Sequence, residues 1–195
     1  MQTTLKAIRA HKPCESGWVK LLGHLGKTKA DDEPLSIATV IDSNGFDDAL
    51  WCLRAVSGHD REIRLFAVWC ARQVQHLMAD ERSVAALDVA ERYANQQATD
   101  DELAAARVAA RSAAWASAWA SAGDAAKAAA KAAAWAAASA VAWASSLDAA
   151  WAAARSAARS AAWGAAWAAA GDAQAAHLRE IINELLKSQK NDNRK

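Results

Sequence analysis

Apolar positions in the first half of the chain recur every three or four residues and predict a series of short amphipathic helices. The first such face is made by Trp18, Leu21, Leu22 and Leu25. Gly26 follows directly and is placed to end that helix. The same spacing predicts further helices over 35–43, 46–56, 61–78 and 80–94. Because the spacers are short and no segment alternates β-branched with polar residues, we predict an all-α domain over residues 1–98.

Residues at the predicted helix starts agree with these boundaries. Pro34 or Ser36 is placed to open the second helix. Asp47 and Asp48 fall in the first turn of the third helix, where the helix dipole favours carboxylates. Asp60 is placed to cap the helix that follows. The local chemistry of the first half therefore supports the helices that its periodicity predicts.

The second half of the chain follows a different pattern, in which Asp recurs every 24 residues. These positions are Asp100, Asp124, Asp148 and Asp172. More than half of the residues from 100 to 171 are Ala, so helix propensity is close to its maximum. Each interval fits one helix with Asp as its N-cap, and Gly123 and Gly171 are placed to end two of them. We predict an antiparallel Ala/Trp-rich array of 24-residue helical repeats with a C-terminal capping helix over 99–188, then a flexible tail over 189–195.

The large side chains of each repeat fall on a four-residue step. Four residues advance about 400° around a helix, so successive side chains shift by about 40° and form an oblique ridge. Such ridges interdigitate where helices cross, and Ala on the facing surface permits close approach. The candidate binding residues on this ridge are Arg107, Arg111, Trp115, Trp119, Lys127, Lys131, Trp135, Trp143, Trp151, Arg155, Arg159, Trp163 and Trp167.

This ridge has three interpretations. As core, its tryptophans fill the space between Ala-lined helices, which is the usual role of a stripe at helical spacing. As surface, part of it contacts a partner, because Trp and Arg dominate binding hot spots. Cations interleaved with aromatic rings also bind single-stranded nucleic acid. The residues that would carry this last interpretation are Lys127, Lys131, Arg155 and Arg159.

A second architecture is open for the Ala-rich half. Residues 100–188 could form one continuous rod, about 130 Å long, that dimerises as a coiled coil. The four-residue step does not hold a stripe on one helix face, and Gly-Asp recurs where turns are needed. We therefore prefer the antiparallel array.

Composition and charge narrow the class of protein. The net charge of +1 selects neither nucleic acid nor an anionic membrane. Cys14, Cys52 and Cys70 are an odd number at unrelated spacings, which indicates a reducing compartment. The N-terminus carries no apolar signal segment, and the longest uncharged stretch, 132–147, is too short to span a bilayer. We expect a cytoplasmic protein that does not enter the membrane.

No motif for catalysis or metal binding is present. His11 and Cys14 form an isolated HxxC pair without further ligands at metal-site spacing. Asp60, between His59 and Glu62, is explained by helix capping, with acid–base chemistry as the alternative. We expect no catalytic residues, no metal ligands and no cofactor.

Two segments carry a resemblance to known families. The stretches "DALWCLRAVSGHDREIRLFAVWCARQVQHL" and "VAALDVAERYANQQATDDELAAARVAARSAAW" resemble the immunity proteins of the fifth polymorphic-toxin immunity class, over roughly residues 46–176. The opening "TLKAIRAHKPCESGWVKLLGHLGKTKADDEPL" is similar to a set of phage and prophage proteins, and that resemblance extends over nearly all of the chain. It implies an all-α, non-enzymatic protein that neutralises another protein by binding it.

The sequence thus favours binding over chemistry. The leading expectation is a non-enzymatic protein-binding factor, either an immunity-like inhibitor or a phage-encoded anti-defence protein that sequesters a toxin or a host defence component. The alternative is a nucleic-acid or nucleotide binding protein that uses the Lys/Arg and Trp ridge. Self-association into a homo-oligomer is also open.

Overall fold

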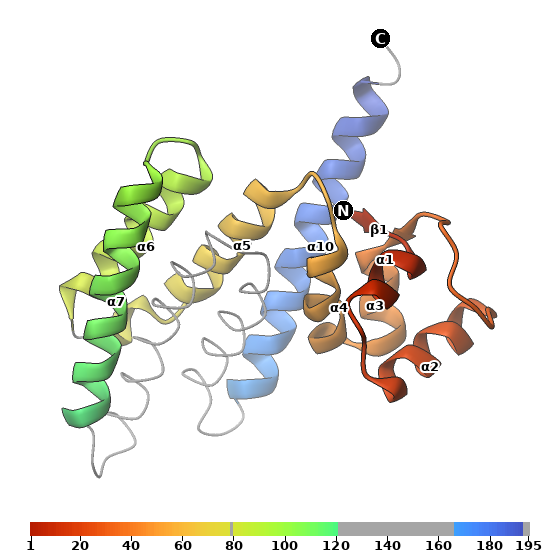
Figure 1. Cartoon of the computed structure of the whole chain (residues 1–195), viewed down its shortest axis with the longest axis horizontal. Helices are drawn as coiled ribbons and strands as arrows, with labels where there is room; N and C mark the ends of the chain where they lie inside the picture. Colours follow the sequence, from red (N-terminus) through yellow and green to blue (C-terminus); the bar gives the residue numbers. More distant parts are fainter. Residues whose placement is uncertain (79, 121–165, 193–195) are drawn as a thin grey trace. The chain divides into compact units, whose positions relative to one another are not determined.

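A computed structural model of the chain describes residues 1–78, 80–120 and 166–192, and these are mostly helical (Figure 1). The prediction of an all-α protein is confirmed. The chain divides into two compact units. One comprises Met1–His59 with Ala175–Lys195, and the other comprises Asp60–Gln174. The boundary at residue 59 differs from the predicted boundary at residue 98, because the helices that follow His59 pack with one another.

The first unit is built from short helices and one minimal sheet. Its elements are β1 Gln2–Thr3, α1 Leu5–Ala10, α2 Glu15–Leu25, β2 Leu35–Ser36, α3 Ile37–Asn44, α4 Phe46–Cys52, the 3-10 turn Leu53–Ala55 and the end of α10, a helix that spans Ala166–Asp192. The two strands are antiparallel and pair Gln2 with Ser36 and Thr3 with Leu35. Helix α1 and this pair of strands were not predicted from the hydrophobic pattern, because each is too short to show a period.

Local capping chemistry sets the ends of the early helices. Ser36 is the N-cap of α3, and its hydroxyl accepts a hydrogen bond from the Ala38 amide at 3.2 Å. Gly26 ends α2 in the left-handed conformation, with φ of 63°. Asp47 and Asp48 lie in the first turn of α4. These boundaries confirm the sequence-based prediction at residue level.

The core of the first unit combines its early helices with the C-terminal part of α10. Leu178 and Ile182 of α10 are fully buried, as are Ile37 and Val40 of α3. Other buried side chains of this unit are Leu5, Ile8, Leu21, Leu50 and Leu53. The Arg179 guanidinium also forms an ion pair with Asp42 of α3 at 2.6 Å. Leu178 and Ile182 are therefore the apolar side chains through which α10 packs in this unit.

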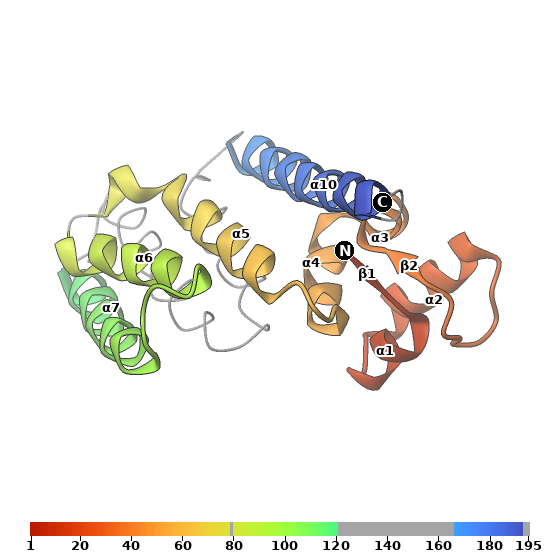
Figure 2. The same ribbon diagram turned by 90° about the horizontal axis from the view of Figure 1, so that it is seen from above.

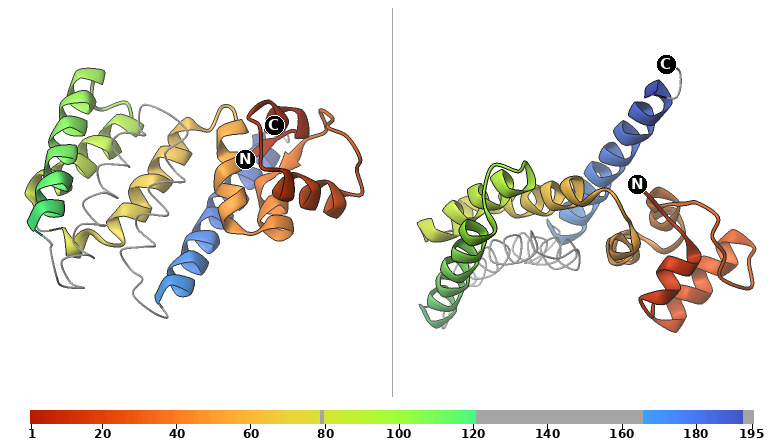
Figure 3. Two further views of the ribbon diagram at one scale, coloured as in Figure 1. Left: turned by 60° about the horizontal axis from the view of Figure 1, so that its bottom comes forward. Right: turned by 45° about the horizontal axis from the view of Figure 1, so that its top comes forward.

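The second unit is a set of neighbouring helices. Its elements are α5 Asp60–Arg72, the 3-10 turn Gln75–Leu77, α6 Glu81–Ala94, α7 Asp100–Ala120 and the beginning of α10. Helix α6 lies between α5 and α7 and packs against both (Figure 1, Figure 2). The two views of Figure 3 keep α6 beside α7. The helix predicted over 61–78 ends earlier, at Arg72, and the 3-10 turn Gln75–Leu77 follows it.

Small side chains fill the contact between α6 and α7. Ala86 and Ala90 of α6 pack with Leu103, Ala110 and Ala114 of α7 in one buried cluster. Because Ala side chains project little, they let helix backbones approach closely. This is the packing role that the sequence predicted for alanine.

Helix α7 begins with a capping box that the sequence analysis did not identify. The Thr99 hydroxyl accepts a hydrogen bond from the Glu102 amide at 3.2 Å, and the Glu102 carboxylate accepts one from the Thr99 amide at 2.8 Å. Asp100, predicted as the N-cap, is instead the first residue of the helix. The Thr-x-x-Glu pattern was readable in the sequence and takes precedence over the Asp at the start of the repeat.

Replacing Thr99 with alanine is expected to lower the free energy of unfolding by about 1 kcal/mol. The Glu102 amide loses its side-chain acceptor, and the reciprocal hydrogen bond of the Glu102 carboxylate is less well aligned. Asp101→Ala, an exposed acidic residue of the same first turn, is the matched control and should cost less than half as much. Urea unfolding followed by far-UV circular dichroism measures both. Equal losses for the two variants would show that Thr99 does not cap the helix.

The Gly171–Asp172 pair does not end a helix. Both residues lie inside α10, which runs without interruption from Ala166 to Asp192. The prediction that Gly171 ends one repeat and Asp172 caps the next is therefore wrong at this junction. A Gly inside a helix costs about 1 kcal/mol relative to Ala, and the helix-forming residues on both sides offset that cost. Among the described residues, no tertiary contact lies within 4 Å of a Cβ built at Gly171, so none of them demands a turn there.

The ends of the Ala-rich half can be compared with prediction only in part. Helix α10 continues to Asp192, so residues 189–192 of the predicted flexible tail are helical. The junctions at Gly123–Asp124 and Asp148 lie outside the described residues, and the 24-residue repeat is not confirmed. Within the described parts of the chain, no helix is both long enough and apolar enough to cross a membrane.

Candidate functional site

The predicted ridge enters the described structure at the beginning of α7. Leu103 is buried against α6, whereas Arg107 and Arg111 are exposed. Val108, beside them, leaves 67% of its surface open to solvent. A four-residue step drifts by about 40° per side chain, and this drift carries the ridge from the buried face of α7 to its exposed face. Arg107 and Arg111 are thus available to a partner.

The rest of the ridge cannot be placed. Trp115 and Trp119 of α7 and Trp167 of α10 have helical backbones, but their side chains lie outside what the structure describes. The ridge residues that fall wholly outside the described residues are Lys127, Lys131, Trp135, Trp143, Trp151, Arg155, Arg159 and Trp163. The choice between a core and a surface role for the tryptophans therefore remains a prediction.

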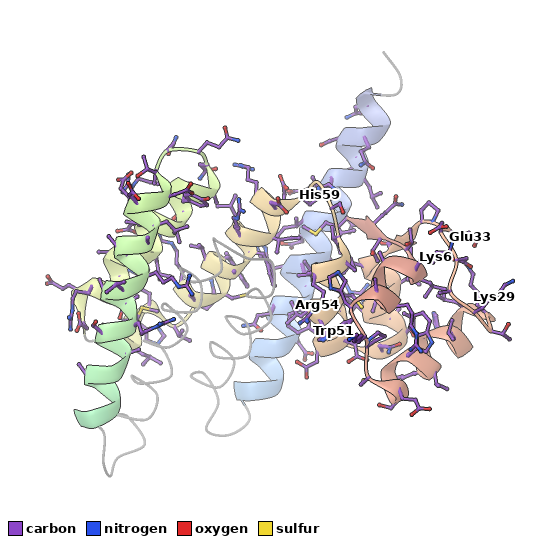
Figure 4. All side chains as sticks on the ribbon, in the orientation of Figure 1. Lys6, Lys29, Glu33, Trp51, Arg54 and His59 are labelled. Carbon is purple, nitrogen blue, oxygen red and sulfur yellow. The ribbon has the colours of Figure 1, made fainter. Side chains whose placement is uncertain are left out.

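A pocket in the first unit is the more complete candidate site. Its volume is about 130 Å³. It is lined by Ile8, Pro13, Cys14, Gly17, Trp18, Asn44, Asp48, Trp51 and Cys52. Trp18 comes from α2 and Trp51 from α4, so two indole rings contribute to the wall (Figure 4 labels Trp51). We call this cavity the two-tryptophan pocket.

One amide holds the polar end of the two-tryptophan pocket together. Asn44 is the last residue of α3. Its side-chain amide donates to the Gly17 carbonyl at 2.8 Å and to Asp48 Oδ2 at 2.8 Å. A Cβ added at Gly17 would lie 2.8 Å from Asp48 Oδ2 and 3.1 Å from Cys14 Sγ. Gly17 therefore allows α2 to approach α4 closely enough to form the pocket.

Charged groups surround the two indoles. The Arg9 guanidinium lies 5.3 Å from the Trp18 ring centroid, and the Arg54 guanidinium lies 4.4 Å from that of Trp51. The Arg54 Nε also donates to the Trp51 carbonyl at 2.9 Å, and Figure 4 shows Arg54 beside Trp51. Cation–π contacts of this kind contribute about 0.5–1 kcal/mol at exposed sites. They hold the indole rings in a fixed orientation.

Asp48 supplies the negative charge of the pocket. Within the described residues, no Lys, Arg or His forms an ion pair with its carboxylate. The pKa of the Cys52 thiol is raised to about 12, first by burial and then by the nearby Asp48 charge, while Arg54 opposes the shift. Asp48 is therefore close enough to act on the groups that line the pocket.

The three cysteines differ sharply in access. All are free thiols; Cys14 is exposed at the pocket, whereas Cys52 and Cys70 are buried. Burial raises the pKa of both buried thiols. Because the thiolate is the reactive form, Cys14 is the thiol that reagents should reach in the folded protein.

Iodoacetamide at neutral pH is expected to alkylate Cys14 in the native protein and to leave Cys52 and Cys70 unmodified until the chain unfolds. Peptide mass spectrometry after timed quenching measures each site. The Cys14→Ser variant is the control and should show no fast alkylation. Fast modification of Cys52 in the native protein would contradict the burial of this side of the pocket.

The sequence does not predict that these residues meet. It places Trp18 on an apolar helix face, Asp48 in the first turn of a helix and Cys14 in an isolated HxxC pair. Cys14 and Trp18 belong to the N-cap and first half of α2, Asp48 lies on α4, and the close approach of α2 to α4 at Gly17 brings them together. No periodic signal marks a site assembled from three elements, so only the structure identifies it.

The described residues do not assemble a candidate metal site. No three His, Cys, Asp or Glu side chains among them lie close enough together to hold a metal ion. Asp60, predicted as the cap of its helix, is instead the first residue of α5. In the comparisons with known proteins, no family model, curated protein or solved structure matches the chain.

Proposed function

We propose that this chain is a protein-binding factor that acts without catalysis, by sequestering a partner through its two-tryptophan pocket. The observation that carries the proposal is the pocket itself: a cavity of side-chain size with two indoles in its wall and guanidinium groups beside them. The resemblance of the chain to immunity proteins and to phage proteins favours an inhibitor of this kind, with a toxin or a host defence protein as its target.

The size of the pocket supports a protein partner over a small-molecule cofactor. Pockets for drug-sized ligands and cofactors have volumes of about 300–1,000 Å³. A cavity of about 150 Å³ holds a benzene-sized group, and the two-tryptophan pocket is close to that size at about 130 Å³. One protruding side chain of a partner would fill it, as an anchor residue fills a pocket at a binding hot spot.

The residue types around the pocket support the same conclusion. Trp and Arg are enriched among the residues that dominate interface energies. Trp18 and Trp51 are each partly exposed, so a partner can contact them without unfolding of the unit. Their guanidinium neighbours, Arg9 and Arg54, would extend the contact surface around the pocket.

Affinity capture with matched variants tests the proposal. The wild-type chain, the pocket variant Trp51→Ala and the control Val108→Ser are immobilised and exposed to lysates of infected and uninfected bacteria. Truncating a hot-spot residue costs 2 kcal/mol or more, which weakens binding by roughly 30-fold. We expect one protein that wild type and Val108→Ser recover and Trp51→Ala does not. Equal recovery by all three proteins, or no enriched protein, would contradict the proposal.

The exposed face of α7 favours nucleic-acid binding as the second candidate function. Arg107 and Arg111 are both exposed on this face, one helical turn apart. Binding through such cations falls steeply with salt, because counterions are released from the nucleic acid. A gel shift with single-stranded DNA and RNA at low salt tests it, with Arg107→Ala/Arg111→Ala as the variant. No shift at low salt would exclude this function.

A further inference from the structure

We propose that the two-tryptophan pocket recognises an alkylammonium group, the end of a lysine side chain presented by the partner. This inference rests on the proposed function, because it names the chemistry of the partner at that site. It is carried by the juxtaposition of an Asp48 carboxylate without an ion-pair partner among the described residues and an apolar cavity walled by Trp18 and Trp51.

The walls of the pocket fit the shaft of a lysine. Ile8, Pro13 and the two indoles offer apolar surface to a chain of methylene groups. Lysine is amphipathic in this way, since its methylene stem packs on apolar surface while its ammonium group seeks a polar partner. Aromatic faces also attract an ammonium ion through their quadrupole. The pocket therefore has a separate complement for each part of the side chain.

The Asp48 carboxylate fits an ammonium better than a guanidinium. Oδ2 already accepts from the Asn44 amide and lies against Gly17, so Oδ1 is the more open acceptor. A guanidinium binds carboxylates best in a fork that uses both oxygens. An ammonium is a point charge that a single oxygen can satisfy. This geometry selects lysine over arginine.

Three groups oppose a cation in the pocket: the N-terminus of α2, Arg54, and Arg9, whose guanidinium lies 5.3 Å from the Trp18 ring centroid. The first turn of α2, at Gly17, lies beside the carboxylate, and a helix N-terminus carries about half a positive charge against the full negative charge of Asp48. Arg54 is held on Trp51 and on the Trp51 carbonyl. Neither guanidinium forms an ion pair with Asp48 among the described residues, so the carboxylate is available to a cationic guest.

The experiment uses Cys14 as a reporter, because this exposed thiol lines the same pocket. The rate at which iodoacetamide alkylates Cys14 is measured in the full chain with n-butylammonium chloride, with 1-butanol, and with potassium chloride at matched ionic strength. Butylammonium and butanol have the same number of non-hydrogen atoms and differ in charge. The titration extends to about 0.1 M, the dissociation constant that a modest ligand efficiency gives for a ligand of five non-hydrogen atoms.

We expect butylammonium to slow the alkylation of Cys14 in a saturable way, with butanol and potassium chloride giving little protection. Asp48→Asn should weaken the butylammonium effect about tenfold, because a hydrogen bond to a charged group is lost. Asp47→Asn, the adjacent exposed carboxylate on α4, is the matched control and should behave as wild type. The comparison of butylammonium with butanol on the wild-type chain needs no variant, so it holds even if Asp48→Asn does not fold.

Equal protection by butylammonium and butanol, or no protection by either up to the highest concentration, overturns the inference. These outcomes are separate from failure of the proposed function, because the probe requires no partner protein. A partner captured in a Trp51-dependent manner, together with no butylammonium protection, would mean that the partner presents a different side chain. Selective protection without a captured protein would support the pocket chemistry and contradict the proposed function.

Discussion

Phe66→Ala is expected to lower the free energy of unfolding of the second unit by about 3–5 kcal/mol, the usual cost of deleting a buried aromatic ring. Phe66 lies on α5 and is completely buried. Its ring also stacks on Trp69, with 6.3 Å between centroids. The substitution removes apolar surface from the core and leaves a cavity that rigid helices close only in part.

Urea unfolding followed by far-UV circular dichroism measures the effect of Phe66→Ala. Val108→Ala is the control, since Val108 is 67% exposed on α7 and should change stability by no more than about 0.5 kcal/mol. A loss below about 1 kcal/mol for Phe66→Ala would show that α5 does not pack through this ring.

Ala173→Pro is expected to cost about 3 kcal/mol or more, because proline inside a helix removes a hydrogen bond and clashes with the preceding turn. Ala173 follows Gly171 and Asp172 inside the continuous helix α10. If Asp172 instead capped a new helix, Ala173 would be its first residue, where proline is well tolerated. The two descriptions of this junction therefore predict very different results.

Gly171→Ala provides an independent check, because the two descriptions of this junction predict effects of opposite sign on stability. In a helix interior with open space around the Cβ, alanine should stabilise the protein by about 1 kcal/mol. At a left-handed helix end it should destabilise by at least a comparable amount. Thermal unfolding of both variants decides between them: tolerance of Ala173→Pro together with destabilisation by Gly171→Ala would restore the predicted helix boundary.

Local side-chain chemistry explains why much of the first half of the fold was predictable. Ser36 caps a helix with its own hydroxyl, and Gly26 ends one with a positive φ. Such signals act within a few residues, so the sequence shows them directly. The hydrophobic pattern did not predict helix α1, because its six residues contain less than two helical turns and show no period.

The Ala-rich half shows where local signals mislead. Gly171–Asp172 has the composition of a helix boundary, yet the strong helix formers around it keep the helix intact. At Thr99 two local signals competed, and the reciprocal capping box determined the first residue of α7. A spacing of Asp residues is therefore weaker evidence for a boundary than a pair of side chains that can satisfy each other's amides.

The candidate site was the least predictable part of the molecule. The residues of the ridge were found because they share one period, and Arg107 and Arg111 are exposed as a binding role requires. Asp48 and Trp51 lie three residues apart on α4, but Trp18 comes from α2, and the packing of α2 near α3 and α4 makes them neighbours. A pocket of this kind depends on tertiary contacts such as that between Asn44 and Gly17.

The most direct test of the central claim, that the two-tryptophan pocket is a binding site for a cationic side chain, is a titration of the ¹⁵N-labelled chain with n-butylammonium. The indole N–H signals are followed by NMR and assigned with Trp→Phe variants. The account predicts saturable shifts for Trp18 and Trp51, with Trp69 of the second unit unchanged as an internal reference. Absence of shifts at Trp18 and Trp51, or shifts of equal size at Trp69, would contradict it.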